Sequence, residues 1–172
     1  MYLSSGILFK YENKVRSLEF VTRKLSMVVA KIAKGSKDPV ILGNLSAVKD
    51  WSYARDCVNG MWKILQQDYP DDFVLGTNES YTVREFVEAA FRTIGRNMTW
   101  KGSGVNEVGL LEDGETLVKV SREFFPPLKS DNYRGDYSKA RKTIGWELGT
   151  KLGAFVKIMV ESDIRKLEVN QP

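Results

Sequence analysis

Two cations at the start of a predicted helix are the side chains best placed to bind a charged ligand. Apolar residues with helical spacing predict this helix between Glu19 and a terminating Gly35, and they are Val21, Leu25, Val28, Val29 and Ile32. Arg23 and Lys24 lie in its first turns, where positive charge opposes the helix dipole. An anion bound at this end would explain their placement. A solvated basic face explains it equally well, so both interpretations stay open.

A second candidate site is the turn at Gly43 and Asn44. Both residue types tolerate positive φ, and an apolar run, Val40–Leu42, precedes them. Ser52 is then the expected N-cap of a helix, with Asp56 in its first turn. The apolar stripe expected to pack this helix on the core is Val58, Met61, Trp62 and Leu65. A polar turn between two packed elements could hold a small polar ligand, and an ordinary strand–turn–helix junction is the alternative.

Several kinds of chemistry lack their usual residues. The chain has no histidine, the commonest general base and metal ligand. Its one cysteine, Cys57, excludes an intramolecular disulfide and fits a reducing compartment. Because Cys57 precedes an apolar helical position, we expect a buried packing residue rather than a reactive thiol. Without a Cys/His cluster of metal-ligand spacing, we expect no metal site.

Size and composition indicate one globular α/β domain over residues 1–172. The 26 basic and 22 acidic residues are interspersed, and the net charge is +4. No basic stripe or nucleic-acid motif accompanies that charge, so we expect no nucleic-acid partner. There is no apolar run of membrane-spanning length and no signal peptide, which favours a cytoplasmic protein with no membrane contact.

Alternating short strands and helices predict the α/β class. The segment Tyr2–Phe9 reads as a strand apolar enough to be buried on both faces, and Lys10–Leu18 reads as a polar loop. Thr82 and Glu85 form a capping-box pattern before a well-specified helix. Further predicted elements are strands at Asp72–Thr77, Met98–Lys101, Val108–Leu111 and Leu117–Val120, a helix ending at Gly145, and an amphipathic helix from Leu152 to Leu167.

The segment Leu42–Gln66 also carries a family resemblance. Its pattern GN-L-x-A-x-[RK]-DW, followed by a helix containing Met-Trp, is similar to GDP-mannose 4,6-dehydratases, which are extended short-chain dehydrogenases/reductases. The resemblance continues through Gly6–Phe9, Glu19–Ser26, Asp72–Thr77, Tyr81–Glu88, Asn106–Gly109 and Gly135–Trp146. It implies the C-terminal substrate-binding lobe of that architecture, with residues 1–9 a remnant strand of the Rossmann sheet and residues 10–172 the sugar-nucleotide-binding lobe.

The resemblance implies a set of substrate-binding residues. Val21 and Lys24 match positions lining the GDP-mannose site, with Lys24 expected on the pyrophosphate. Gly43 and Asn44 match the turn beside the nucleotide. Lys49 replaces the arginine of the Arg-Asp-Trp segment, which keeps the charge and loses the bidentate fork.

For the cofactor, the resemblance implies NADP, bound mostly by the N-terminal half of the family's chain. Tyr11 stands where a cofactor-contacting histidine is usual, and Arg16 matches an arginine near the NADP. The family's glycine-rich loop and Tyr-x-x-x-Lys pair do not occur in this sequence. The tyrosines that lack a lysine four residues on are Tyr2, Tyr11, Tyr53, Tyr69, Tyr81, Tyr133 and Tyr137. We therefore expect no catalysis by this chain alone.

Two stretches depart from the family's polar pattern. Ser5 and Lys10 replace asparagines, and Pro126–Lys129 stands where an Arg-Pro-x-Glu segment holds phosphate and ribose. One bidentate arginine–phosphate contact contributes roughly 1.5–3 kcal/mol. Losing that contact and the ribose acceptor would weaken binding by about a hundredfold.

Two functions therefore compete. The first is the substrate-binding portion of a GDP-mannose 4,6-dehydratase, completed by a separate N-terminal half; that enzyme converts GDP-mannose to GDP-4-keto-6-deoxymannose in the GDP-fucose pathway. The alternative is a truncated, catalytically silent binding or interaction module. Strands evolved for a larger sheet would expose apolar edges, so we also expect a homo-oligomer or aggregation.

Overall fold

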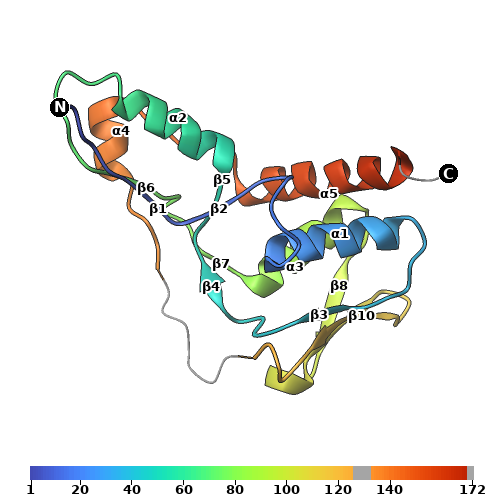
Figure 1. Cartoon of the computed structure of the whole chain (residues 1–172). Coiled ribbons are helices and arrows are strands. Elements are labelled where there is room, and N and C mark those ends of the chain that lie inside the picture. The colour runs from blue at the N-terminus through green and yellow to red at the C-terminus, as the bar shows by residue number, and fades with distance from the viewer. Residues whose placement is uncertain (126–132, 170–172) are drawn as a thin grey trace.

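The main hydrophobic core lies between three helices and a four-stranded sheet. The structure, a computed structural model, describes residues 1–125 and 133–169. The helices are α1 (Val21–Ala33), α3 (Val83–Thr93) and α5 (Leu152–Val169), and the strands are β3 (Val40–Leu42), β8 (Met98–Lys101), β9 (Val108–Leu111) and β10 (Thr116–Val120). Figure 1 shows α5 above α1 and α3, with the sheet below them. Leu25, Val29, Phe91, Phe155 and Met159 have no exposed surface and form the centre of this core.

The sheet has the order β3-β10-β9-β8. Its first pair is parallel, with Val118 opposite Val40, and its other two pairs are antiparallel. The turn after β9 joins two strands that the sequence predicts, and Gly114 supplies its positive φ of 84°. A short 3-10 helix, η1 (Gly104–Asn106), connects β8 to β9.

A second, smaller core lies at the end of the molecule that carries the N-terminus (Figure 1). It is built by β1 (Gly6–Leu8), β6 (Phe73–Leu75), α2 (Ala54–Ile64) and α4 (Ser138–Ile144), which we call the α2–α4 unit. The strands β1 and β6 are parallel. Gly60 lets α2 approach β6 closely, because a Cβ at this position would lie 2.7 Å from Leu75. The Trp146 indole donates to the Asp56 carbonyl at 2.9 Å and ties the segment after α4 to α2.

Two strand pairs join the α2–α4 unit to the main core. They are β2 (Lys10–Glu12) with β5 (Trp51–Tyr53), parallel, and β4 (Val48–Lys49) with β7 (Tyr81–Thr82), antiparallel. Asp50, between β4 and β5, is buried and accepts hydrogen bonds from the Thr77 amide at 3.0 Å, the Thr77 hydroxyl at 2.8 Å and the Gly135 amide at 2.8 Å. This carboxylate therefore ties three distant segments together.

Most predicted helices are confirmed. Helix α1 ends before Gly35, which has a φ of 96°, and α4 ends at the left-handed Gly145. Thr82 and Glu85 make both hydrogen bonds of the capping box at the start of α3. Cys57 is buried as expected, with its sulfur 3.3 Å from the Ser52 hydroxyl, and burial raises the pKa of its thiol.

The prediction of which apolar stripe packs α2 on the core is wrong. Val58, Met61, Trp62 and Leu65 are all exposed, and the buried positions of the helix are instead Cys57, Gly60 and Ile64. The expected N-cap is also wrong, because Ser52 is buried in β5 and the capping position is Tyr53, without a side-chain hydrogen bond. Both stripes have helical spacing, and periodicity alone does not reveal which one meets the core.

The N-terminal segment also differs from expectation. The strand expected over Tyr2–Phe9 is reduced to β1, and Ile7 is half exposed rather than buried. The expected loop after it contains β2, whose partner β5 is about forty residues away in sequence. A polar sequence such as Lys10–Glu12 forms a strand here because a distant strand supplies its hydrogen bonds. Within the described ranges, no helix is long and apolar enough to cross a membrane.

Candidate functional site

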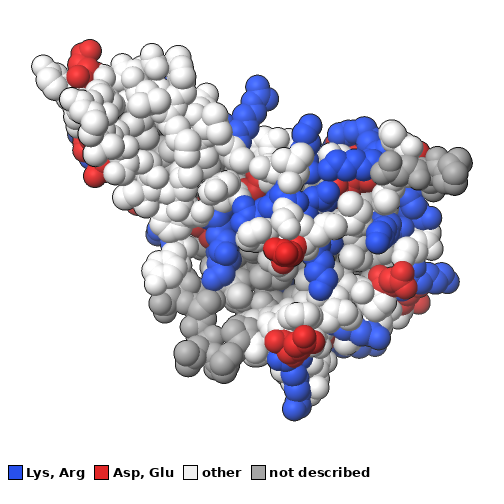
Figure 2. Space-filling view, in the orientation of Figure 1, with Lys and Arg blue, Asp and Glu red and all other residues white. Residues whose placement is uncertain are grey.

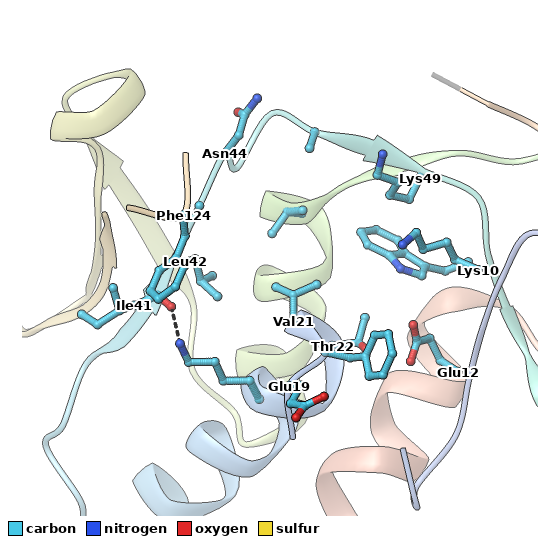
Figure 3. Close-up of a pocket in the computed structure, with 16 residues that line it drawn as sticks. Lys10, Glu12, Glu19, Val21, Thr22, Ile41, Leu42, Asn44, Lys49 and Phe124 are labelled. Carbon is cyan, nitrogen blue, oxygen red and sulfur yellow. Dashed lines mark hydrogen bonds between the residues drawn. The ribbon is translucent and has the colours of Figure 1, made fainter. Parts of the chain in front are cut away.

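A cavity of about 410 Å³ opens between the start of α1, the turn after β3, and the strands β2 and β5. Figure 3 shows side chains from these separate elements converging on one space. Its lining is mainly apolar, including Val21, Leu42, Trp51 and Phe124, with a few charged groups among them. Apolar walls with a small number of placed polar groups are typical of ligand pockets of this size.

The cavity brings together all the residues expected to contact substrate. Val21, Lys24, Gly43, Asn44 and Lys49 all line it. They come from α1, from the turn after β3 and from β4, so the tertiary fold assembles them. Their role in binding a ligand stays a prediction.

The two cations at the start of α1 have different environments, and neither expected explanation fits both. Arg23 is buried and forms an ion pair with Asp163 of α5, so it is neither a solvated residue nor an anion ligand in the cavity. Lys24 faces the cavity. Its ammonium donates to the Ile41 carbonyl at 2.9 Å, the dashed line in Figure 3, and lies 5.0 Å from the centre of the Phe124 ring. One hydrogen bond leaves donors on the Lys24 ammonium for a ligand.

The turn after β3 depends on close packing rather than on a left-handed backbone. Gly43 was expected for its tolerance of positive φ, but neither it nor Asn44 adopts it. A Cβ on Gly43 would lie 2.0 Å from the Phe124 carbonyl oxygen, so only glycine fits here. The Asn44 side-chain oxygen accepts from the Ser46 amide at 2.9 Å and stabilises the turn. Phe124 thus forms one wall of the cavity and holds the turn in place.

The charged lining is mixed. Lys10 and Lys49 lie on the same side of the cavity in Figure 3, with Glu12 below them and Glu19 at the lower rim. Glu12 is buried, and burial raises the pKa of its carboxyl; Arg16, whose Nε lies 3.2 Å from the carboxylate, acts against that rise. With Lys24, the charged lining therefore comprises three lysines and two carboxylates.

Sequence reasoning missed Lys10, Glu12 and Phe124 as cavity residues. Both Lys10 and Glu12 were expected in a loop, and Lys10 also as the replacement of a family asparagine, because the pairing of β2 with β5 cannot be read from local pattern. Phe124 precedes a proline-containing segment that gave no regular signal. The alternation of Lys10 and Glu12 was the one available hint, since it places both side chains on the same face of a strand.

The residues expected to contact the cofactor lie beside the cavity rather than in its lining. The Arg16 guanidinium donates to the Tyr11 carbonyl at 2.6 Å, and it lies 3.7 Å from the centre of the Phe20 ring. This guanidinium is therefore engaged within the chain, and the sequence has no glycine-rich loop to hold a pyrophosphate. These residues do not make a dinucleotide site by themselves, and a contribution of Tyr11 and Arg16 to one stays a prediction.

The cavity lining offers a ligand several hydrogen-bond donors. Besides the lysine ammonium groups, the side chains of Thr22, Asn44 and Trp51 carry donors, and the described lining contains no tyrosine, histidine or cysteine. The same residues 1–125 and 133–169 contain no group of His, Cys, Asp and Glu side chains able to hold a metal ion. Pro126–Lys129, which depart from the family pattern, lie outside the described residues.

Comparison with known proteins assigns the chain to a family. The profile of a family described as GDP-mannose 4,6 dehydratase matches residues 1–159. The chain belongs to the GDP-mannose 4,6-dehydratase family. "GDP-mannose 4,6 dehydratase 2" of Caenorhabditis elegans is 46% identical over 170 residues, covering 99% of this chain and 44% of that protein. The Cricetulus griseus protein of the same family is 41% identical over 171 residues, covering 99% of this chain and 46% of its own length.

Solved structures resemble the whole chain in fold. RMD from Pseudomonas aeruginosa, complexed with NADPH, has a TM-score of 0.75 at 10% identity and matches 94% of this chain and 48% of its own. The dTDP-glucose 4,6-dehydratase of Bacillus anthracis, in complex with NAD, has a TM-score of 0.69 at 14% identity. It matches 95% of this chain and 45% of its own. This member of the GDP-mannose 4,6-dehydratase family thus spans about half the length of the relatives it matches, with a mixed α/β fold like that of extended dehydratases.

Proposed function

We propose that this chain is the C-terminal, substrate-binding portion of a GDP-mannose 4,6-dehydratase. A separate N-terminal half would supply the NADP site and the catalytic groups for converting GDP-mannose to GDP-4-keto-6-deoxymannose. The observation that carries the proposal is the convergence of Val21, Lys24, Gly43, Asn44 and Lys49 on one cavity. Sequence motifs alone indicate these residues, without any information on their proximity.

The chemistry of the cavity supports a nucleotide sugar. Lys24 and Lys49 can each donate to phosphate oxygens, and Lys10 adds a third ammonium group. Trp51 and Phe124 offer apolar area for a base or the face of a sugar ring. MoeE5, which is similar in fold, has a solved structure in complex with UDP-glucose and NAD.

The fold is consistent with the C-terminal half of an extended short-chain dehydrogenase. The parallel pair β1–β6 in the α2–α4 unit fits a remnant of a Rossmann sheet, because isolated two-stranded parallel sheets are otherwise rare. Residues 10–172 would then form the sugar-nucleotide lobe. NADP would bind mostly to the other half, with Tyr11 and Arg16 at its margin.

A second candidate is a catalytically silent binding or interaction module of the same fold. The carboxylates of Glu12 and Glu19 favour it, because each would repel a pyrophosphate in the cavity. The engaged guanidinium of Arg16 favours it as well.

Thermal unfolding of the purified chain with and without GDP-mannose decides between the two. Ligand at about 100 times its dissociation constant adds roughly 2.7 kcal/mol to the free energy of unfolding. For a chain of this size, that is a rise in Tm of roughly 5–10 °C. We expect this rise with GDP-mannose, a smaller one with GDP and none with NADP. A cooperative transition that no nucleotide moves would leave the silent module as the function.

The matched pair Lys49→Met and Lys119→Met tests the cavity itself. Lys49 lines it, whereas Lys119 is exposed on β10 and is not a lining residue. Losing one charge-assisted contact costs roughly 1.5–3 kcal/mol, so Lys49→Met should weaken GDP-mannose binding about tenfold or more. Lys119→Met should leave it unchanged. Equal affinities in the two variants would place the ligand outside this cavity.

A further inference from the structure

Helix α2 has two apolar faces, and this chain covers only one of them. Cys57, Gly60 and Ile64 pack against the small core. The second face, which we call the α2 stripe, comprises Val58, Met61, Trp62 and Leu65, with exposed fractions of 62%, 39%, 60% and 65%. A surface helix normally shows one apolar face and one polar face, and a helix apolar on both sides is normally buried.

The surface around the α2 stripe is also nearly free of charge. In Figure 2 the part over α2 is almost entirely white, whereas blue side chains crowd the remainder of the view. The exposed Val58, Met61, Trp62 and Leu65 make this area apolar, and Arg55, one turn before Val58, is an exposed cation at its margin. Contiguous apolar surface of this kind marks an interaction site, and one flanking arginine is too little positive charge for a nucleic-acid partner.

The α2 stripe continues into a free strand edge. The Met61 side chain lies against Gly6 of β1, because a Cβ on Gly6 would be 4.0 Å from the Met61 Cγ. Within residues 1–125 and 133–169, the only strand paired with β1 is β6, so the other edge of β1 is open. Ile7 on this strand is 50% exposed. Parallel sheets are normally covered on both faces, and their strands normally have a neighbour on each side. At β1 one face is partly exposed and one edge has no neighbouring strand among the described residues.

We propose that the α2 stripe and the open edge of β1 form the docking surface for an α/β polypeptide with a parallel sheet. An edge strand of the partner would pair with β1, and an apolar face of the partner would cover Trp62 and Leu65. The occupant we commit to is the dinucleotide-binding N-terminal half of the family's chain. This choice rests on the proposed function.

Two observations favour this occupant. The match with the C. elegans relative covers 99% of this chain but only 44% of that protein, so more than half of the relative's length lies outside the match. The N-terminus of this chain lies on the α2–α4 unit, only a few residues before β1 (Figure 1). Where the two halves are continuous, the preceding segment would therefore reach this surface directly.

The proposal is tested by mixing this chain with the N-terminal segment of the C. elegans relative, produced separately and containing the residues before the matched region. Sedimentation velocity and titration calorimetry measure the complex. We expect a one-to-one complex, and slower hydrogen exchange by at least about tenfold at the amides of Gly6–Leu8 when it forms. The relative's own C-terminal half serves as the positive control for a competent partner.

The double substitution Trp62→Glu with Leu65→Glu should weaken the complex about thirtyfold or more, as expected for buried anchor residues. Both side chains are largely exposed in this chain, so its unfolding transition should be retained. The control is Val169→Glu, which places a single glutamate on an apolar residue that is 83% exposed at the end of α5, and it should bind normally.

Three results would overturn the proposal. The first is failure of this chain to bind a partner that the relative's own C-terminal half does bind. The second is equal weakening by Val169→Glu. The third is a homodimer abolished by the Trp62 and Leu65 substitutions, which would assign the surface to a second copy. Because GDP-mannose is absent from these measurements, a failed complex and a failed ligand shift are distinguishable.

Discussion

Neighbouring residues of like charge serve different purposes in this chain. Arg23 and Lys24 are adjacent in α1, yet Arg23 is buried in an ion pair with Asp163 while Lys24 faces the cavity. Adjacent side chains on a helix point about 100° apart, so one can lie in a helix–helix contact while the next lines a cavity. The unfavourable placement of these charges relative to the dipole is thus offset by two separate tertiary contacts.

Gly43 sets the position of the cavity's turn. Alanine here would drive a Cβ into the Phe124 carbonyl, and overpacking of this kind costs about 1–3 kcal/mol. We expect Gly43→Ala to lower the free energy of unfolding by that amount and to weaken the GDP-mannose shift. Urea denaturation measures the first effect.

Gly153 in α5 provides the control, since nothing lies within 4 Å of a Cβ there. Gly153→Ala should raise stability by roughly 0.5–1 kcal/mol through helix propensity. If both alanine variants behaved alike, the close contact at Gly43 would not be what holds the turn.

The buried Glu12 makes stability depend on pH. Its folded-state pKa is raised above the usual 4.5 by burial, so the folded chain binds this proton more tightly than the unfolded chain. The contribution of the protonated form is complete below about pH 4.5 and is lost as pH rises through the raised pKa. We expect the free energy of unfolding to fall across that window, and urea denaturation at a series of pH values measures it.

Glu12→Gln removes the titrating group and keeps its shape. The variant should lack the Glu12 part of the slope, so the stability difference between the two proteins should change with pH above 4.5. Parallel pH profiles would show that Glu12 titrates normally.

Among the elements, α1 and α5 are joined by one buried and one exposed ion pair. Arg23 pairs with the fully buried Asp163, which also accepts from the Ser26 hydroxyl at 2.8 Å. Lys34 pairs with Glu168 at the surface. The two pairs connect the same two parts of the fold and differ mainly in burial. Together they test how burial changes the contribution of an ion pair to the free energy of unfolding.

We expect Asp163→Asn to destabilise the chain by about 3–5 kcal/mol, because it leaves the Arg23 cation buried without its counter-charge. Glu168→Gln should cost under about 1 kcal/mol, since its pair is solvated. Chemical denaturation of both variants measures the difference. Similar losses in the two would mean that the contact of α1 with α5 depends on its apolar packing alone.

Helix α2 shows how an element can be correctly predicted and incorrectly oriented. Its position in the chain and the acidic residue in its first turn agree with the sequence pattern. Its core-facing side does not, because Cys57, Gly60 and Ile64 meet β6 and α4 while the more apolar Trp62 and Leu65 face outward. Hydrophobicity would place Trp62 inside, and the close approach permitted by Gly60 places the other face there instead.

For the whole molecule, the two proposed surfaces are separate. The cavity lies between α1, β3 and β2, whereas the α2 stripe and the β1 edge belong to the unit around the small core. Asp50 connects the two regions through its hydrogen bonds to Thr77 and Gly135. We therefore expect a ligand and a protein partner to bind at the same time, as the proposed divided dehydratase would require.

The sequence by itself determined the family, the α/β class, most helix boundaries and the residues expected to bind substrate, which the structure places in one cavity. These properties follow from local periodicity, caps and motifs, which are written in short stretches of chain. Only the tertiary structure decided that Lys10–Glu12 is a strand, that Arg23 is buried and that the stripe containing Trp62 is exposed. Each of these depends on a partner distant in sequence, or on one outside this chain, and local pattern contains no record of which face a partner will cover.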